Sequence, residues 1–121
     1  VVGNDFFFFF CLTAGRELLT RPIDERPTAV FAGSDNSALG VYEAARELGL
    51  RVPDDVSVIG FDDTLMASWA TPRLTTIRQP LHDMGAAGIR TAQGRPLTAA
   101  GHIRVSTTLI LRDSTGPVPQ A

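Results

Sequence analysis

Three short segments carry side chains that could bind a small polar ligand. They are Gly33-Ser34-Asp35-Asn36, Asp62-Asp63 and Gln79-Pro80. A carboxylate can accept hydrogen bonds from two neighbouring hydroxyl groups, and a side-chain amide offers both a donor and an acceptor. A carboxylate, an amide and a hydroxyl that met at one place would therefore suit a ligand with several hydroxyl groups.

Each of these segments follows a predicted strand. The runs at 28–32 and 56–61 are short, apolar and rich in β-branched or aromatic residues, as buried parallel strands tend to be. A third short strand is predicted over 74–78. Open parallel sheets bind their ligands beyond the carboxyl ends of the strands. We therefore expect the three polar segments to meet at one edge of the sheet.

A helix is predicted between the first two strands, from about Asp35 to Leu48. Its apolar residues recur at helical spacing, and Gly49 stands where a glycine commonly ends a helix. Strand, helix and strand form a βαβ unit, whose crossover should be right-handed. Free N–H groups at the start of the helix favour anions and polar oxygens. Ser34 and Asp35 could therefore bind a ligand or serve only as helix caps.

The remaining segments extend this α/β pattern. Helices are predicted over 12–19 and 81–92, and alternating apolar residues predict a strand over 102–111. Val1–Val2 would be the end of a preceding strand. The sequence thus predicts an open, mostly parallel sheet flanked by helices.

The length and composition bound the possible functions. A chain of 121 residues fits one domain or a piece of a larger one. We expect a partial lobe at 1–113 and a loose, Gly/Pro-rich tail at 114–121.

The formal charge is −2 without a basic stripe, which argues against a nucleic-acid surface on this chain itself. Its start lacks the basic region and cleavage site of a signal peptide. Cys11 is the single cysteine and gives no reason to expect an oxidising compartment.

The motifs of common enzymes are missing. All 11 basic residues are arginine, so the lysine of a phosphate-binding GxxxxGK[ST] loop is absent, as is the lysine that receiver domains normally use. GSDNSALG does not match GxGxxG, and no GxSxG motif is present. His82 and His102 have no metal-ligand spacing with Cys11. We therefore predict no catalytic residue, no metal site and no cofactor.

Two stretches closely resemble the C-terminal half of LacI/GalR-type transcriptional regulators. They are RPTAVFAGSDNSALGVYEAARELGLRVPDDVSVIGFDD and TPRLTTIRQPLHDMG. The match extends over about residues 26–85 without a gap, and LILRDSTGP resembles the last strand and tail of the family. The resemblance implies one lobe of a periplasmic-binding-protein-like domain, which holds a small effector between two lobes.

The resemblance also implies ligand-binding residues. The first aspartate of the family motif G-[FY]-D-D binds effector hydroxyls, and it corresponds to Asp62. The polar residue before the aspartate of the strand-to-helix turn corresponds to Ser34, and the glutamine of LTT-x-x-Q corresponds to Gln79. The frame of GNDFFFFFCLTAGRELL places Phe6 at an aromatic position that stacks against the effector.

A dimer interface is implied for the helix that begins at Asp35 and for the stretch 64–69. Its candidate residues are Leu39, Tyr42, Leu65, Met66 and Trp69. Packing in the core of the lobe would explain Leu39 and Tyr42 equally well.

The run Phe7–Phe10 departs from the family, which usually has small, polar or acidic residues there. One interpretation is an unusually apolar effector pocket or contact patch. The other, which we favour, is a local departure from the natural sequence. A membrane anchor is excluded by length, because the apolar run is far shorter than the roughly 20 residues that span a bilayer.

These observations predict part of a ligand-responsive transcriptional regulator. The chain would bind a sugar or related polyol as effector, form a homodimer in the cytoplasm, and act on operator DNA through a headpiece outside this chain. The ligand would shift the population between two arrangements of the dimer. The alternatives are a periplasmic-type sugar-binding protein of a transport system and an α/β enzyme.

Overall fold

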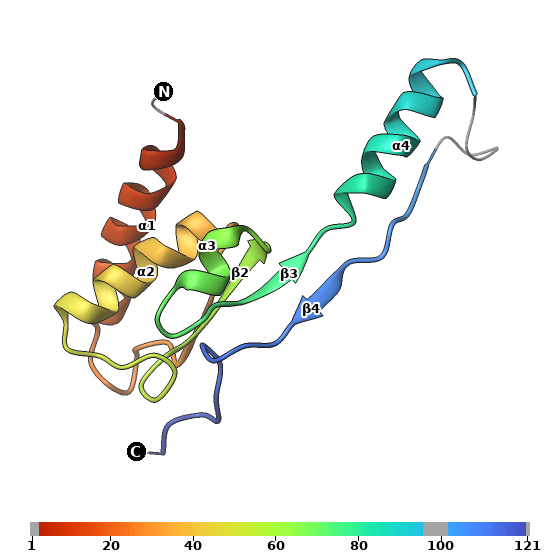
Figure 1. Cartoon of the computed structure of the whole chain (residues 1–121). Coiled ribbons are helices and arrows are strands. Elements are labelled where there is room, and N and C mark those ends of the chain that lie inside the picture. Colours follow the sequence, from red (N-terminus) through yellow and green to blue (C-terminus); the bar gives the residue numbers. More distant parts are fainter. Residues whose placement is uncertain (1–2, 96–101, 121) are drawn as a thin grey trace.

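The computed structural model describes residues 3–95 and 102–120. Four strands form one sheet in the order β1-β2-β3-β4. β1, β2 and β3 run parallel, and β4 is antiparallel to β3. The predicted α/β class and the mostly parallel sheet are confirmed. The elements are α1 (Gly3–Leu19), β1 (Ala29–Phe31), α2 (Asp35–Glu47), β2 (Ser57–Asp62), α3 (Leu65–Trp69), β3 (Thr75–Arg78), α4 (Leu81–Ala92) and β4 (Thr108–Ile110) (Figure 1).

The predicted βαβ unit is present as β1, α2 and β2. The hydroxyl of Ser34 accepts a hydrogen bond from the backbone N–H of Ser37 over 3.1 Å, so Ser34 caps the start of α2. Gly49 follows the end of the helix with a φ of 69°, a conformation that glycine adopts without strain. These two local signals fix where α2 begins and ends, and hence where the chain reaches the ends of β1 and β2.

α1 begins much earlier than the predicted helix at 12–19, because the phenylalanine run is itself helical. The helix crosses α2 closely at Gly40, where an added Cβ would lie 2.5 Å from the backbone oxygen of Phe8. Phe8 packs against the core, whereas the other four phenylalanines of the run are more than half exposed. Among the described residues, no helix is both long and apolar enough to cross a membrane.

The core lies between the sheet and the helices α1 and α2. Its buried residues lie on or next to the parallel strands β1, β2 and β3 and on the helices. Those on α2 are mostly small. This close packing holds the ends of β1, β2 and β3 in fixed positions. The buried members are Leu12, Leu19, Ala32, Ala38, Val41, Ala44, Ala45, Val56, Val58, Ala67 and Leu74.

α4 and β4 extend away from this packed body. Figure 1 shows α4 at the far end of β3, separated from α1 and α2. Leu81 and Ile89 of α4 are 64% and 63% exposed. The predicted strand at 102–111 is shorter than expected, because only 108–110 pairs with β3. Alternation of apolar residues continues outside that range, but it forms a strand only where a partner strand is present.

The chain returns to the sheet after β4. Ser114 is fully buried, and its hydroxyl donates to the backbone oxygen of Val58 and accepts from the backbone N–H of Thr75. The start of the tail, which we expected to be loose, is therefore attached to both β2 and β3 at this residue. Val1–Val2, predicted to end a strand, lie outside the described residues.

Candidate functional site

A cavity of about 450 Å³ opens where β1 and β2 end. Its walls come from the segment after β1, the segment after β2 and the first half of α1. The residues with polar or large side chains in the lining are Phe7, Ser34, Asn36, Ser37, Asp62, Thr64 and Met66. The position agrees with the general rule for parallel sheets, since this is the edge formed by the carboxyl ends of the strands.

Ser34 caps α2 and also lines the cavity. Its hydroxyl accepts from the backbone N–H of Ser37 as a helix cap and donates to the hydroxyl of Ser37 over 3.0 Å. The side chain is only partly buried and lines the cavity. Ser34 therefore offers a hydroxyl oxygen to the cavity while it holds the start of α2.

Asp62 and Gln79 are in direct contact. The Nε2 group of Gln79 donates to Oδ1 of Asp62 over 2.7 Å. Asp62 lines the cavity and has a φ of 114°, which a residue with a side chain rarely adopts. Gln79 follows β3 and stands beside the cavity rather than in its lining. The structure thus brings Ser34, Asp62 and Gln79 to the ends of three neighbouring strands.

Asp35 has a structural role. Its buried carboxylate accepts hydrogen bonds from the hydroxyl of Thr76 and from both the N–H and the hydroxyl of Thr64. A Cβ on Gly60 would collide with Oδ1 of Asp35, so only glycine leaves room for this carboxylate. Asp35 therefore joins the start of α2 to β3 and to the segment before α3, and it is not part of the cavity lining.

Asp63 and its neighbour Asp62 have different partners. Its carboxylate pairs with Arg78 and with Arg112 at 2.6 Å and 2.7 Å. Burial raises the pKa of Asp63, but the hydrogen bonds from Arg112 and Arg78 lower it by more, so the pKa lies below the usual value for aspartate. Asp63 is therefore charged at neutral pH.

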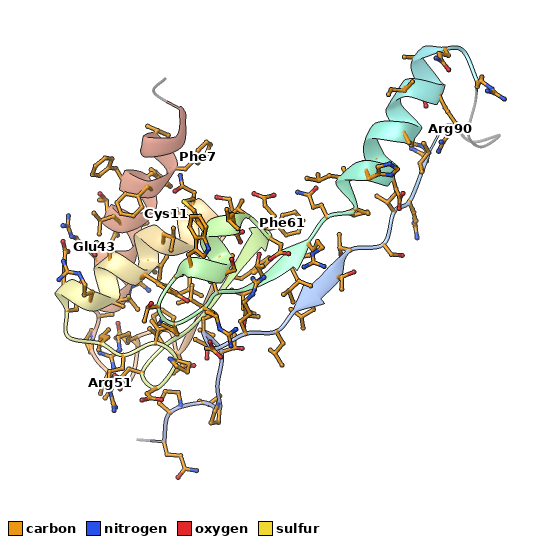
Figure 2. All side chains as sticks on the ribbon, viewed as in Figure 1. Phe7, Cys11, Glu43, Arg51, Phe61 and Arg90 are labelled. Atoms are coloured by element: carbon orange, nitrogen blue, oxygen red, sulfur yellow. The ribbon has the colours of Figure 1, made fainter. Side chains whose placement is uncertain are left out.

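Phe7 contributes the aromatic wall of the cavity (Figure 2). Phe6, the residue chosen from the family frame, is 62% exposed and stacks on Phe10 with ring centroids 6.2 Å apart. The helical geometry of α1 separates these two neighbours by about 100° around the axis, so one faces the cavity while the other faces outwards. Helical periodicity could have identified Phe7, but a run of five identical residues shows no periodicity.

The residues proposed for a dimer interface fall into two groups. Leu65, Met66 and Trp69 lie on the short helix α3 and are 62%, 42% and 72% exposed. Met66 also lines the candidate ligand cavity, a role that the sequence analysis missed. Leu39 and Tyr42 line a separate groove beside Pro72.

Tyr42 is also attached to the body of the lobe. It packs against the core, and its hydroxyl donates to the backbone oxygen of Pro72 over 3.0 Å. Burial raises the pKa of Tyr42 to about 12, which keeps this donor protonated. Core packing therefore explains why part of the Tyr42 side chain is buried. The rest of the side chain lines the groove.

Comparison with known proteins adds a second line of evidence. The sequence profile of the periplasmic binding protein-like domain matches residues 10–115. The chain belongs to this family. Within this periplasmic binding protein-like family, the chain is a fragment of the effector domain of a LacI/GalR-type regulator.

The relatives with known names are transcriptional regulators. The HTH-type transcriptional regulator DegA of Bacillus subtilis is 43% identical over 114 residues, which are 90% of this chain and 34% of DegA. The chain thus spans about a third of the length of this relative.

Solved structures give the same result for the fold. A LacI family transcriptional regulator from Lactobacillus casei with bound glucose superposes with a TM-score of 0.73 at 32% identity, over 89% of this chain and 39% of that one. The lac repressor dimer bound to operator and the anti-inducer ONPF superposes with a TM-score of 0.76 at 32% identity, over 88% and 37%.

Proposed function

We propose that this chain is the effector-binding, dimer-forming part of a transcriptional regulator that responds to a small polyhydroxylated ligand. The observation that carries this proposal is the cavity in which Ser34 and Asp62 meet, with Gln79 bonded to Asp62. The bound glucose in the Lactobacillus casei regulator supports a sugar or related polyol as the ligand class.

The side chains of the cavity suit such a ligand. Asp62 can accept hydrogen bonds from two neighbouring hydroxyls, and Gln79 can exchange its bond to Asp62 for a bond to the ligand. Phe7 offers an aromatic face to the apolar C–H face of a sugar ring. Ligand hydroxyls would thus take the place of water around polar groups that the fold already holds in position.

The dimer would form through the exposed apolar surface of α3 and the groove beside it. Leu65 and Trp69 are large, exposed and adjacent, which is typical of an interaction surface. Leu39 and Tyr42 lie in the neighbouring groove. Because Met66 borders both the cavity and this surface, a ligand could bias the arrangement of two chains through it.

DNA binding would belong to a part of the regulator outside this chain. The lac repressor structure contains operator DNA and is a dimer, which supports the same arrangement here. The site of action would then be the cytoplasm, where the operator lies. The regulator is favoured over a sugar-binding transport component because the relatives reported above are named as regulators. The same relatives favour a non-enzymatic role over an α/β enzyme.

The experiment is a ligand screen on the full-length regulator that carries this chain. Thermal unfolding is measured with a panel of pentoses, hexoses, disaccharides and sugar alcohols, and a panel of purines serves as a control class. We expect one or a few polyols to raise the melting temperature and to change operator affinity in a gel-shift assay. A protein stabilised by purines alone, or by no member of either panel, would contradict the proposal.

A further inference from the structure

Asp63 holds together three segments that are distant in the sequence. Its side chain is 7% exposed, and it contacts one arginine at the end of β3 and one just after β4. Arg78 donates through Nε to Oδ2, and Arg112 donates through Nη2 to Oδ1. Each carboxylate oxygen therefore has its own charged donor, and hydrogen bonds between charged groups are stronger than those between neutral groups.

Arg112 is itself fixed by further hydrogen bonds. Its Nη1 group donates to the backbone oxygen of Leu74 over 2.9 Å, and its backbone N–H donates to the hydroxyl of Thr75 over 2.9 Å. Its side chain is 15% exposed, so these bonds are largely shielded from water. Arg112 therefore connects Asp63 to the start of β3 and to the segment after β4.

The turn that carries Asp63 is also the rim of the cavity. Asp62 and Asp63 have φ values of 114° and 55°, so two successive residues hold conformations that favour glycine. Such a turn persists only where its surroundings fix it, and the ion pairs of Asp63 provide that fixation. The carboxylate of Asp62 is positioned by the same turn.

β3 and β4 lead from this point to α4. Figure 1 shows the two strands leaving the packed body side by side, and Figure 2 shows Arg90 on α4 far from Phe61 on β2. Arg78 is paired with Thr108 at the last position of the β3–β4 ladder. A displacement of the Asp62-Asp63 turn would therefore also displace the two strands at the place where they leave the body.

We propose that Asp63 is a positioning residue that makes the rim of the cavity and the pair β3–β4 move as one unit. This inference rests on the proposed function, since it gives the cavity a physical connection to α4. Asp63 does not line the cavity, and its effect on a ligand would act through Asp62.

The test compares amide hydrogen exchange in the full-length protein for four forms without ligand. They are the wild type, Asp63→Asn, Asp62→Ala and Asp113→Asn. Asp113 is the matched control, because it also pairs with an arginine next to β3, but its side chain is 50% exposed. The substitution to asparagine keeps the size of the side chain, removes its charge and replaces one acceptor oxygen with an NH2 donor.

We expect Asp63→Asn to accelerate exchange at 62–65 and at 108–112 together, by about ten- to hundredfold, given the usual worth of charge-assisted hydrogen bonds. Exchange in α1 and α2 should stay within about threefold of the wild type. Asp62→Ala and Asp113→Asn should leave exchange at 108–112 unchanged. This regional pattern distinguishes a positioning role from general loss of stability, which accelerates exchange everywhere.

Two results would overturn the proposal. One is unchanged exchange at 108–112 in Asp63→Asn, and the other is equal acceleration in every element. A failure of the polyol screen would reject the proposed function and leave this result standing, because the exchange experiment contains no ligand.

Discussion

The side-chain amide of Gln79 bonds to the carboxylate of Asp62 over 2.7 Å and thereby links the residues that follow β2 and β3. The bond holds the two strand ends together. A site whose side chains are positioned by such bonds needs little ordering when a ligand enters. Asp62 would then determine ligand affinity and contribute little to folding.

Asp62→Ala should therefore abolish the ligand-induced rise in melting temperature while it changes the melting temperature of the free protein by only a few degrees. The carboxylate is the strongest acceptor in the lining, and its loss should weaken ligand binding at least about a hundredfold. Thermal unfolding with and without the polyol found in the screen measures both quantities. Asp54→Ala is the control, because Asp54 is an exposed partner of Arg51 away from the cavity. An undiminished ligand response in Asp62→Ala would refute this role.

Gly60→Ala should destabilise the protein by about 2–4 kcal/mol, because the new Cβ would meet Oδ1 of Asp35 and the side chain of Leu74. Gly85→Ala in α4 is the matched change, since nothing lies within 4 Å of its added Cβ. That control should be neutral or stabilise by up to about 1 kcal/mol. Urea unfolding gives both free energies. Equal effects of the two substitutions would show that the contact between Gly60 and Asp35 does not constrain the sheet.

The stability contributed by Asp63 should depend on pH. Its pKa in the folded protein lies below the usual value of about 3.9, so its contribution is present above that value and is lost as the pH falls through the folded pKa. The difference in free energy of unfolding between the wild type and Asp63→Asn should therefore be constant from about pH 7 to pH 5. It should shrink below about pH 4. Urea unfolding across this range measures it, and a difference independent of pH down to about pH 2 would contradict the charged state of Asp63.

Substitution by serine should destabilise the protein much more at Phe8 than at Phe9. Phe8 packs against the core, so Phe8→Ser should lower the free energy of unfolding by about 2–4 kcal/mol. Phe9 is 61% exposed, so Phe9→Ser should cost less than about 1 kcal/mol and should reduce self-association. Urea unfolding and light scattering measure the two effects. Self-association that is equal in the wild type and Phe9→Ser would contradict a contribution of the exposed Phe9 ring.

Much of the sheet could be predicted from local sequence signals. Apolar runs bounded by prolines identified β1 and β2, and the capping serine with the terminal glycine identified α2. The positions of Ser34, Asp62 and Gln79 followed from one rule about parallel strands, which needs no knowledge of side-chain contacts. These elements could be predicted because the residues that indicate each one lie within a short stretch of the sequence.

Other features depend on contacts between distant residues. Asp63 and Arg112 are 49 residues apart, and nothing near either one indicates the ion pair. The helical state of the phenylalanine run depends on the close crossing of α1 over Gly40, since phenylalanine has only modest helix propensity. The position of α4 away from the body could not be predicted either. Its amphipathic pattern predicts a helix with one apolar face but does not say what covers that face.

The pairing of Arg78 with Thr108 has a consequence for how this chain tolerates change. The segment between these residues leaves the sheet at one member of a paired position and returns at the other. The pairing of β3 with β4 therefore does not depend on the length of this segment. We therefore expect insertions or deletions within 80–107 to leave the strand order and register of the body intact. A short hairpin turn could replace the whole excursion, and the remaining residues would still form a continuous sheet.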